Sequence, residues 1–196
     1  MALLLGACGT GQRAYQSGSL KEVFLDRVPT VNNNSPDMMS CYYVPASCLA
    51  MTQRLLVSHF ACENVATIAK KDYDPEYLRD GRMYNETSRF MEELRLKDCA
   101  GYASVGMDVG RWLASLEQGV PPLVLFKDQG AEQAFTRIRH ATLLLAGISY
   151  QTDEVTQKVM PVWLTFLVPT GISSVKTIKV RWQTLRNEMY AVYAAE

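Results

Sequence analysis

The chain has 196 residues, of which 48% are hydrophobic and 20% charged, so it is long enough for one sizeable core and too short for two ordinary domains. Twenty basic and twenty acidic residues give a formal net charge of zero, which favours neither a nucleic acid nor an anionic bilayer as a partner. Five cysteines without the regular spacing of a disulfide scaffold, and only two histidines, argue against a disulfide-knotted mini-protein and a structural zinc domain.

The first residues carry a separate signal. Leu5-Gly6-Ala7-Cys8 has the small-residue spacing of a bacterial lipobox, which ends in a lipidated cysteine. The apolar stretch before it is short and has no basic residue ahead of it, so an incidental Cys8 in an apolar N-terminus is the alternative. On the first interpretation, residues 1–20 are a lipobox-like N-terminus and flexible tether, Cys8 is the membrane anchor, and the protein belongs to the bacterial cell envelope or is secreted. Otherwise we expect it in the cytoplasm.

Residues 21–196 are predicted to form one domain whose first half is helical. Val23–Leu25 predicts a short extended segment, and the turn formers of Asn32–Asp37 predict a loop. Gly119 is expected to end a helix with a left-handed cap. Apolar residues at helical spacing predict three helices, over Ala46–Phe60, Ser88–Leu96 and Val109–Gln118.

The second half of the chain predicts a sheet. Short apolar runs bounded by breakers are typical of strands, and four occur, at Pro121–Phe126, Ala141–Ile148, Val162–Val168 and Val175–Trp182. A short helix is expected from Gln183 onward. The order of elements indicates an α+β fold in which an N-terminal helical part packs on a C-terminal antiparallel β-sheet. The tryptophans, including Trp112, Trp163 and Trp182, are expected to pack in the core.

Cys41 is the candidate nucleophile. A reactive cysteine is favoured at a helix N-terminus, where exposed N–H groups and the positive end of the helix dipole stabilise the thiolate. Cys41 lies between the Asn-rich loop and the first predicted helix, and backbone N–H groups there could also hold an oxyanion. Cys48 belongs to the apolar stripe of that helix, and we expect it to be a small buried side chain.

His140 is the candidate base. It stands at the start of a strongly apolar strand, where a catalytic imidazole would be held rigidly. His59 falls toward the end of the first helix, too far along it to reach back to Cys41, and is expected to be structural. A cysteine early in the chain and a histidine about a hundred residues later follow the order expected of Cys–His catalysis on a helix-plus-sheet scaffold.

These residues resemble a known family. Met39-Ser40-Cys41-Tyr42-Tyr43 resembles the nucleophile motif of papain-like cysteine peptidases, in particular the effector proteases of plant-pathogenic bacteria. The runs Leu116–Leu125 and His140–Ile148 are similar to the order of long helix, Gly-x-Pro strand and histidine strand in bacteriocin-processing peptidase domains. The resemblance spans roughly Val28 to Gly171 and implies a papain-like peptidase domain over residues 21–196.

The resemblance also implies roles for individual residues. Cys41 would be the nucleophile and His140 the general base and acid. The family places a Gln upstream of the nucleophile as an oxyanion donor, and that Gln is missing here. Asn33 or Asn34 lies at about the right separation and carries the same amide group, so Asn34 is the candidate donor.

The family's imidazole-orienting residue is also replaced. The family has an Asp or Asn after the strand that follows the histidine strand, often before a proline, and here Val168-Pro169 occupies that place. Valine cannot orient an imidazole. Asp153, in the turn after the histidine strand, is the nearest carboxylate that could substitute, with a solvated turn residue as the alternative. Nucleophile and base can retain some activity without the third member.

The resulting expectation is a cysteine peptidase that cleaves an amide bond of a peptide or protein through a thioester, with no cofactor and no metal. Three alternatives use the same sequence features. The first is a catalytically weak or inactive papain-like binding module of the bacterial envelope, and the second is a Cys–His amidase or acyltransferase that acts on a non-protein substrate such as peptidoglycan. The third is a purely structural envelope lipoprotein.

Overall fold

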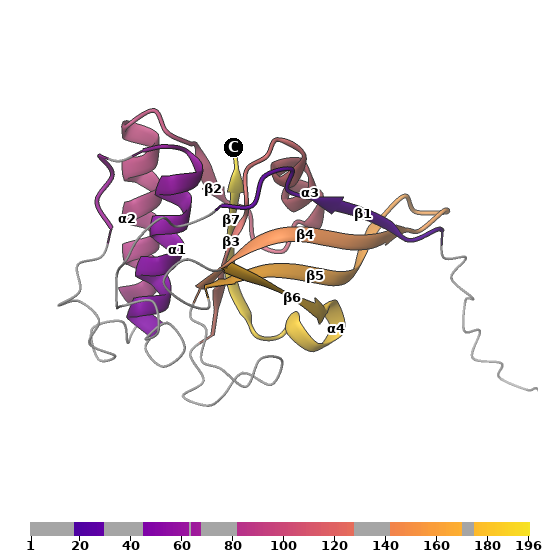
Figure 1. Ribbon diagram of the computed structural model, residues 1–196. Coiled ribbons are helices and arrows are strands. Elements are labelled where there is room, and N and C mark those ends of the chain that lie inside the picture. Colours follow the sequence, from indigo (N-terminus) through magenta and orange to yellow (C-terminus); the bar gives the residue numbers. More distant parts are fainter. Residues whose placement is uncertain (1–17, 30–44, 63, 68–81, 128–141, 170–174) are drawn as a thin grey trace, which may run out of the picture.

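The structure is a computed structural model, and it describes residues 18–29, 45–62, 64–67, 82–127, 142–169 and 175–196. These residues form an α+β fold with a seven-stranded antiparallel sheet (Figure 1). The helices of the described part are α1 (Pro45–His59), α2 (Arg82–Leu96), α3 (Val109–Glu117) and α4 (Trp182–Leu185). Its strands are β1 (Lys21–Phe24), β2 (Tyr102–Ser104), β3 (Leu123–Phe126), β4 (Thr142–Thr152), β5 (Val159–Pro169), β6 (Val175–Arg181) and β7 (Met189–Ala195).

The sheet has the strand order β2-β7-β3-β4-β5-β6, and β1 pairs with β4 outside this order. The long strand β4 therefore pairs with three other strands. Along one edge of β4, β3 pairs with its first residues and β1 with its later ones, while β5 pairs with the other edge. Phe24 of β1 lies opposite Gly147 of β4, and a Cβ at that glycine would collide with the Phe24 ring. The close approach of β1 to β4 therefore requires glycine at position 147.

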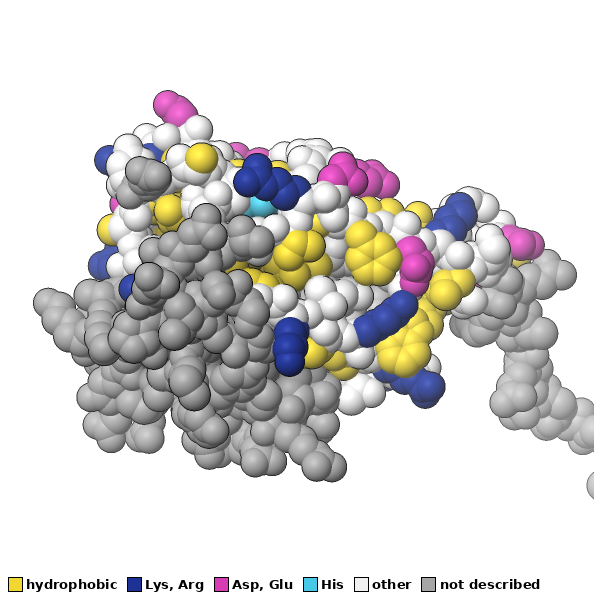
Figure 2. All heavy atoms as spheres, in the orientation of Figure 1, with side chains coloured by type: hydrophobic (Ala, Val, Ile, Leu, Met, Phe, Trp, Pro, Cys, Tyr) yellow, Lys and Arg dark blue, Asp and Glu magenta, His cyan; other side chains and the backbone are white. Residues whose placement is uncertain are grey.

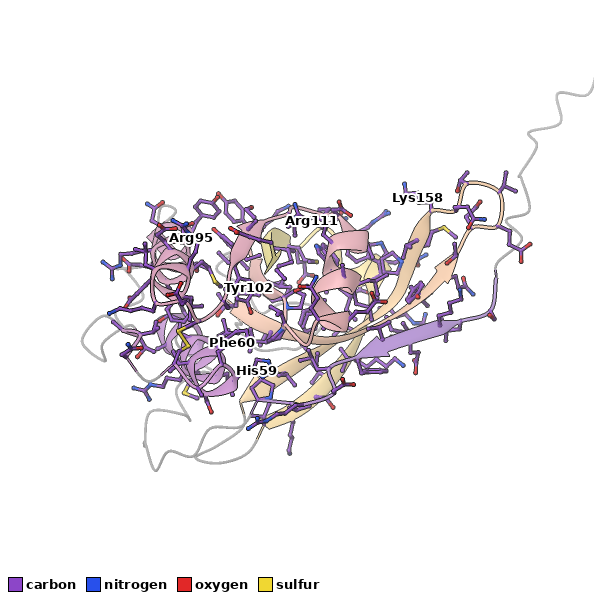
Figure 3. All side chains as sticks on the ribbon, turned by 90° about the horizontal axis from the view of Figure 1, so that it is seen from above. His59, Phe60, Arg95, Tyr102, Arg111 and Lys158 are labelled. Carbon is purple, nitrogen blue, oxygen red and sulfur yellow. A yellow bond between two sulfur atoms is a disulfide. The ribbon has the colours of Figure 1, made fainter. Side chains whose placement is uncertain are left out.

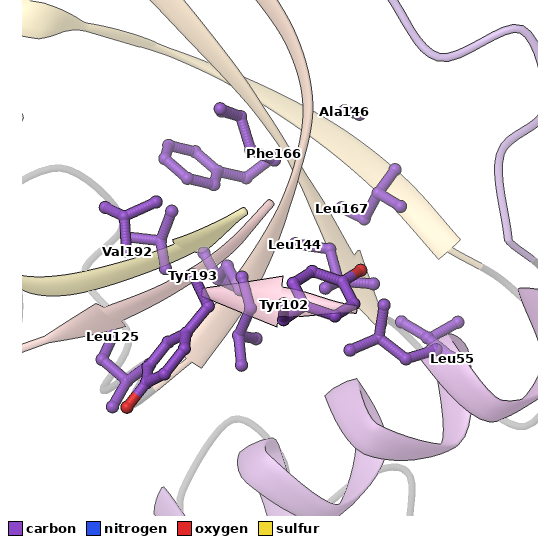
Figure 4. Close-up of a cluster of buried hydrophobic side chains, with 14 of the residues drawn as sticks. Leu55, Tyr102, Leu125, Leu144, Ala146, Phe166, Leu167, Val192 and Tyr193 are labelled. Carbon is purple, nitrogen blue, oxygen red and sulfur yellow. The ribbon is translucent and has the colours of Figure 1, made fainter. Parts of the chain in front are cut away.

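Helices cover both faces of the sheet. On the face toward α1, Leu55 of that helix lies near Tyr102 and Leu144, whereas Phe166 and Val192 lie on the opposite side of the strands (Figure 4). We call these the α1 face and the α3 face. Helices α3 and α4 contact strands of the α3 face, and the two helices meet where the ring of Trp112 packs edge-on against Trp182 with centroids 5.9 Å apart.

Most elements predicted from the sequence are present. The first predicted helix corresponds to α1, and α2 begins six residues before the predicted Ser88. Asp108 caps the start of α3 by accepting a hydrogen bond from the N–H of Arg111, and Gly119 follows the helix with a φ of 74° as expected. The four predicted strands correspond to β3, β4, β5 and β6, and Val23–Leu25 corresponds to β1.

The predicted separation of helices and strands along the chain needs correction. Strand β1 comes from the N-terminal end, α3 lies between β2 and β3 in the sequence, and α4 lies between β6 and β7. Strands β2 and β7 were not predicted, although β7 is an interior strand that pairs with both β2 and β3. The α+β class is confirmed.

A disulfide joins the two long helices, which the cysteine spacing did not reveal. Cys62, just after α1, is bonded to Cys99, just after α2, with Cα atoms 6.0 Å apart (Figure 3). The bond closes 37 residues of sequence and fixes the two helix ends against each other. In the part of the chain that is described, no helix is long and apolar enough to cross a membrane.

Candidate functional site

The main predicted site residues lie outside the described residues. These are Cys41, His140, Asn33 and Asn34, together with Cys8 of the lipobox-like segment. The structure does describe the two elements that adjoin the candidate pair, since α1 begins at Pro45 and β4 begins at Thr142. Helix α1 and strand β4 are therefore the described elements nearest in sequence to the candidate pair.

Cys48 and Thr52, the fourth and eighth residues of α1, pack directly on the first residue of β4. The Cys48 thiol donates a hydrogen bond to the carbonyl oxygen of Thr142, with Sγ and O 3.1 Å apart. Thr142 Oγ1 donates to Thr52 Oγ1 at 3.2 Å, and Thr52 Oγ1 in turn lies 2.9 Å from the Cys48 carbonyl oxygen and 3.4 Å from that of Thr142. All three residues are buried, as predicted for Cys48. We call this contact the α1–β4 junction.

Val168 is the next-to-last residue of β5. Strand β5 runs antiparallel to β4 with Leu167 opposite Leu144, so the end of β5 borders the beginning of β4. Val168 is buried and belongs to the hydrophobic core. The position at which the resemblance would place an imidazole-orienting Asp or Asn is therefore an apolar core position in this chain.

Asp153 lies at the opposite end of β4 from the junction. The eleven residues of β4 span about 35 Å at 3.3 Å per residue. One Asp153 carboxylate oxygen accepts hydrogen bonds from the backbone N–H groups of Val155 and Thr156, at 3.0 and 2.7 Å. These bonds hold the turn between β4 and β5. Asp153 thus has a role in the turn, as in the alternative interpretation, although its side chain is buried and not solvated, and the carboxylate does not lie at the end of β4 where Thr142 begins the strand.

The turn bonds predict an acid-sensitive contribution from Asp153. Hydrogen bonds from the Thr156 backbone and side chain, and then from Val155, hold the pKa of the Asp153 carboxyl below its usual value of 3.8. Stabilisation by the ionised group is fully present above that value and is lost as the pH falls through the lower folded-state pKa. Urea unfolding of Asp153→Asn between pH 6 and 2 is expected to show a smaller loss of stability on acidification than the unmodified protein. Equal acid sensitivity of the two proteins would contradict this role.

His59 has the structural role predicted for it. Its Nε2 donates to the carbonyl oxygen of Gly119 at 2.7 Å, which ties the end of α1 to the turn after α3. The neighbouring Phe60 ring meets Tyr102 of β2 edge-on, with centroids 6.3 Å apart (Figure 3). His59 and the α1–β4 junction lie toward opposite ends of α1, so this imidazole is not part of the candidate site.

A groove at the far end of the α1 face was missed by the sequence interpretation. It has a volume of about 460 Å³, and Trp163, which was assigned to the core, lines it and is only partly buried. Trp112 is fully buried, as predicted. Nowhere in the described ranges do three His, Cys, Asp or Glu side chains gather so that they could hold a metal ion.

Comparisons with protein-family models, with curated proteins and with solved structures found no match to this chain.

Proposed function

We propose that this protein is a papain-like cysteine peptidase in which Cys41 is the nucleophile and His140 the general base and acid. The observation that carries the proposal is the α1–β4 junction. Cysteine–histidine catalysis requires the thiol and the imidazole to lie within hydrogen-bond reach of each other. In this chain the two residues adjoin the start of α1 and the start of β4 in sequence. In this fold Cys48 and Thr52 of α1 are in direct hydrogen-bonded contact with the first residue of β4.

Chain connectivity supports the pairing. Cys41 precedes Pro45, the first residue of α1, by four residues, and His140 precedes Thr142 by two. A fully extended chain spans at most about 3.6 Å per residue. The Cα atom of His140 is therefore tied within about 7 Å of that of Thr142, and Cys41 within about 14 Å of Pro45. Both residues are thus attached by short segments to elements that meet at the α1–β4 junction.

The start of α1 offers the electrostatics that the reaction needs. The first N–H groups of a helix have no intrahelical partner, and together with the helix dipole they favour a thiolate and a developing oxyanion. In the proposed reaction, the Cys41 thiolate attacks the amide carbonyl, and His140 donates its proton to the leaving amine, which leaves a thioester. His140 then takes a proton from water, which attacks the thioester, and the acid product and the thiol are released. Asn34 is the proposed side-chain oxyanion donor.

The disulfide supports a location outside the cytoplasm. Structural disulfides form and persist in the periplasm, at the cell surface and in secreted proteins, and are rare in the cytosol. The Cys62–Cys99 bond is therefore consistent with the lipobox-like Leu5-Gly6-Ala7-Cys8 and with a peptidase tethered to the bacterial envelope.

Alkylation by iodoacetamide tests the proposal. The experiment uses the full chain with Cys8→Ser, unreduced so that Cys62 and Cys99 stay paired, and follows Cys41 and Cys48 separately by peptide mass mapping. A thiolate stabilised by the helix and by His140 is expected to react at pH 6 about 100-fold faster than an ordinary thiol with a pKa near 8.5. Cys48, which is fully buried, is the internal control.

Two variants sharpen the result. His140→Ala is expected to reduce Cys41 alkylation at pH 6 toward the rate of an ordinary thiol, whereas His59→Ala, far from the junction, is expected to leave the rate unchanged. If Cys41 is alkylated no faster than glutathione, and His140→Ala leaves this rate unchanged, the result contradicts the peptidase proposal and favours a binding module. Fast, His140-dependent alkylation without Cys41-dependent cleavage of denatured casein would instead favour an amidase or acyltransferase that acts on a non-protein substrate.

A further inference from the structure

Among the described elements, no long helix packs over the part of the α1 face around Trp163. Trp163 lies four residues from Leu167 along β5 and therefore points to the same side of the sheet, and it pairs with Arg181 of β6 and Ser149 of β4. In the described part of the structure, the main sheet contacts of α1 and α2 are with β4 and β2, respectively. Figure 2 shows large apolar side chains beside basic and acidic ones over β1, β5 and β6.

A groove is built into this open region. The Arg181 guanidinium lies over the Trp163 ring, with its central carbon 5.1 Å from the ring centroid. Gln151 and Gln183 also line the groove, and the remaining lining is apolar, from Met160, Pro161 and Val162. The volume of about 460 Å³ lies within the usual range for ligand sites. Its lining combines an aromatic surface, hydrogen-bonding amides and one cation.

The charge of the groove points to an anionic ligand. Lys179 forms an ion pair with Glu22 at 3.0 Å, and Glu22 also accepts a hydrogen bond from Ser149. Among the described residues no carboxylate pairs in this way with Arg181, which is exposed and contacts the Trp163 ring. A guanidinium stacked on a ring keeps its N–H groups in the guanidinium plane, where they can bind a carboxylate with two hydrogen bonds.

The β6 edge of the described sheet favours a peptide as the ligand. Strand β6 pairs with β5, and its other edge pairs with no described strand. This strand carries three basic residues and no acidic one. An extended peptide can add to such an edge through main-chain hydrogen bonds and leave alternate side chains to enter pockets. Basic side chains on β6 would select acidic peptides.

We propose that the groove binds an acidic side chain of an extended peptide substrate, about four to seven residues from the scissile bond. The spacing rests on the proposed function, which places the reaction at the α1–β4 junction next to Leu167. Trp163 and Met160 are four and seven residues farther along β5. An extended peptide advances by about the same 3.3 Å per residue as the strand. A peptide side chain four to seven residues from the scissile bond would therefore reach the stretch of β5 between Trp163 and Met160. The groove thus acts as a specificity site remote from the catalytic pair.

Binding is tested without catalysis, in the full chain carrying Cys41→Ala. Tryptophan fluorescence is titrated at low salt with a capped hexapeptide of alternating glutamate and glycine and with its glutamine counterpart. The glutamate peptide is expected to bind at least about tenfold more tightly, in line with the two charge-assisted hydrogen bonds of an Arg–carboxylate pair. Arg181→Gln is expected to abolish this preference. Lys176→Gln is the matched control, because Lys176 is a cation of the same strand that points to the opposite face.

Several outcomes would overturn the proposal. Equal binding of the two peptides, or equal losses from Arg181→Gln and Lys176→Gln, would leave only unspecific attraction to basic residues. Displacement of the glutamate peptide by free glucuronate at equal concentration would assign the groove to carboxylated sugars instead. This result can be distinguished from that of the alkylation test. If the titration fails but Cys41 is alkylated fast, the proposed peptide binding in the groove is contradicted and the proposed peptidase function is not.

Discussion

Replacing both Cys62 and Cys99 with serine is expected to lower the free energy of unfolding by about 4 kcal/mol. The disulfide closes a loop of 37 residues, and the loss of chain entropy that a loop of this length imposes on the unfolded state amounts to about 4 kcal/mol at 25 °C. Typical domains have a stability of only about 5–15 kcal/mol, so the variant should lose a large share of its stability. Urea denaturation followed by circular dichroism measures the change.

Reduction of the native protein provides the control. Dithiothreitol is expected to shift the unfolding midpoint of the unmodified protein to that of the double variant and to leave the double variant unchanged. Identical midpoints for the oxidised and reduced native protein would contradict the stabilising role of the bond. A large effect would also mean that the fold depends on an oxidising compartment, because the bond fixes the ends of α1 and α2.

Elements with a strong local pattern were predictable from the sequence. Helix α1 has apolar residues at helical spacing, and α3 has an N-cap at Asp108 and a glycine after its last turn. Strand β7 was missed because its sequence, MYAVYAA, is rich in alanine, which favours a helix in isolation. Pairing with β2 and β3 overrides that preference, and such pairing depends on residues distant in the sequence.

The places of Asp153 and of the disulfide also depend on contacts between residues distant in the sequence. Asp153 follows the predicted histidine strand closely in sequence, but β4 continues to Thr152 and carries the carboxylate to the far end of the sheet. The disulfide could not be inferred because it depends on how α1 and α2 are packed, whereas cysteine spacing reports only positions along the chain. The contact of α1 with β4 is compatible with the predicted pairing of Cys41 with His140, and that pairing itself stays a prediction because both residues lie outside the described residues.

Burial in β5 was the least predictable feature, and it leads to a stability prediction. Nearly all residues of β5 are apolar, so the sequence gives no alternation that distinguishes its two faces. Phe166 points to the α3 face, where it is fully buried and packs edge-on against Phe126 with ring centroids 5.8 Å apart. Trp163 points to the open part of the α1 face. Only the helices packed on each side decide which of these two aromatic residues belongs to the core.

Phe166→Ala is therefore expected to lower the free energy of unfolding by about 3–5 kcal/mol, because it leaves a cavity in the core. Trp163→Ala should cost only about 1–2 kcal/mol, since it removes a partly exposed ring and a cation–π contact worth up to about 1 kcal/mol. The two variants are matched, because both truncate an aromatic residue of the same strand, and urea denaturation compares them directly. If Trp163→Ala destabilised the protein as much as Phe166→Ala, Trp163 would be part of a packed core, and the face that forms the groove would not be open to a ligand.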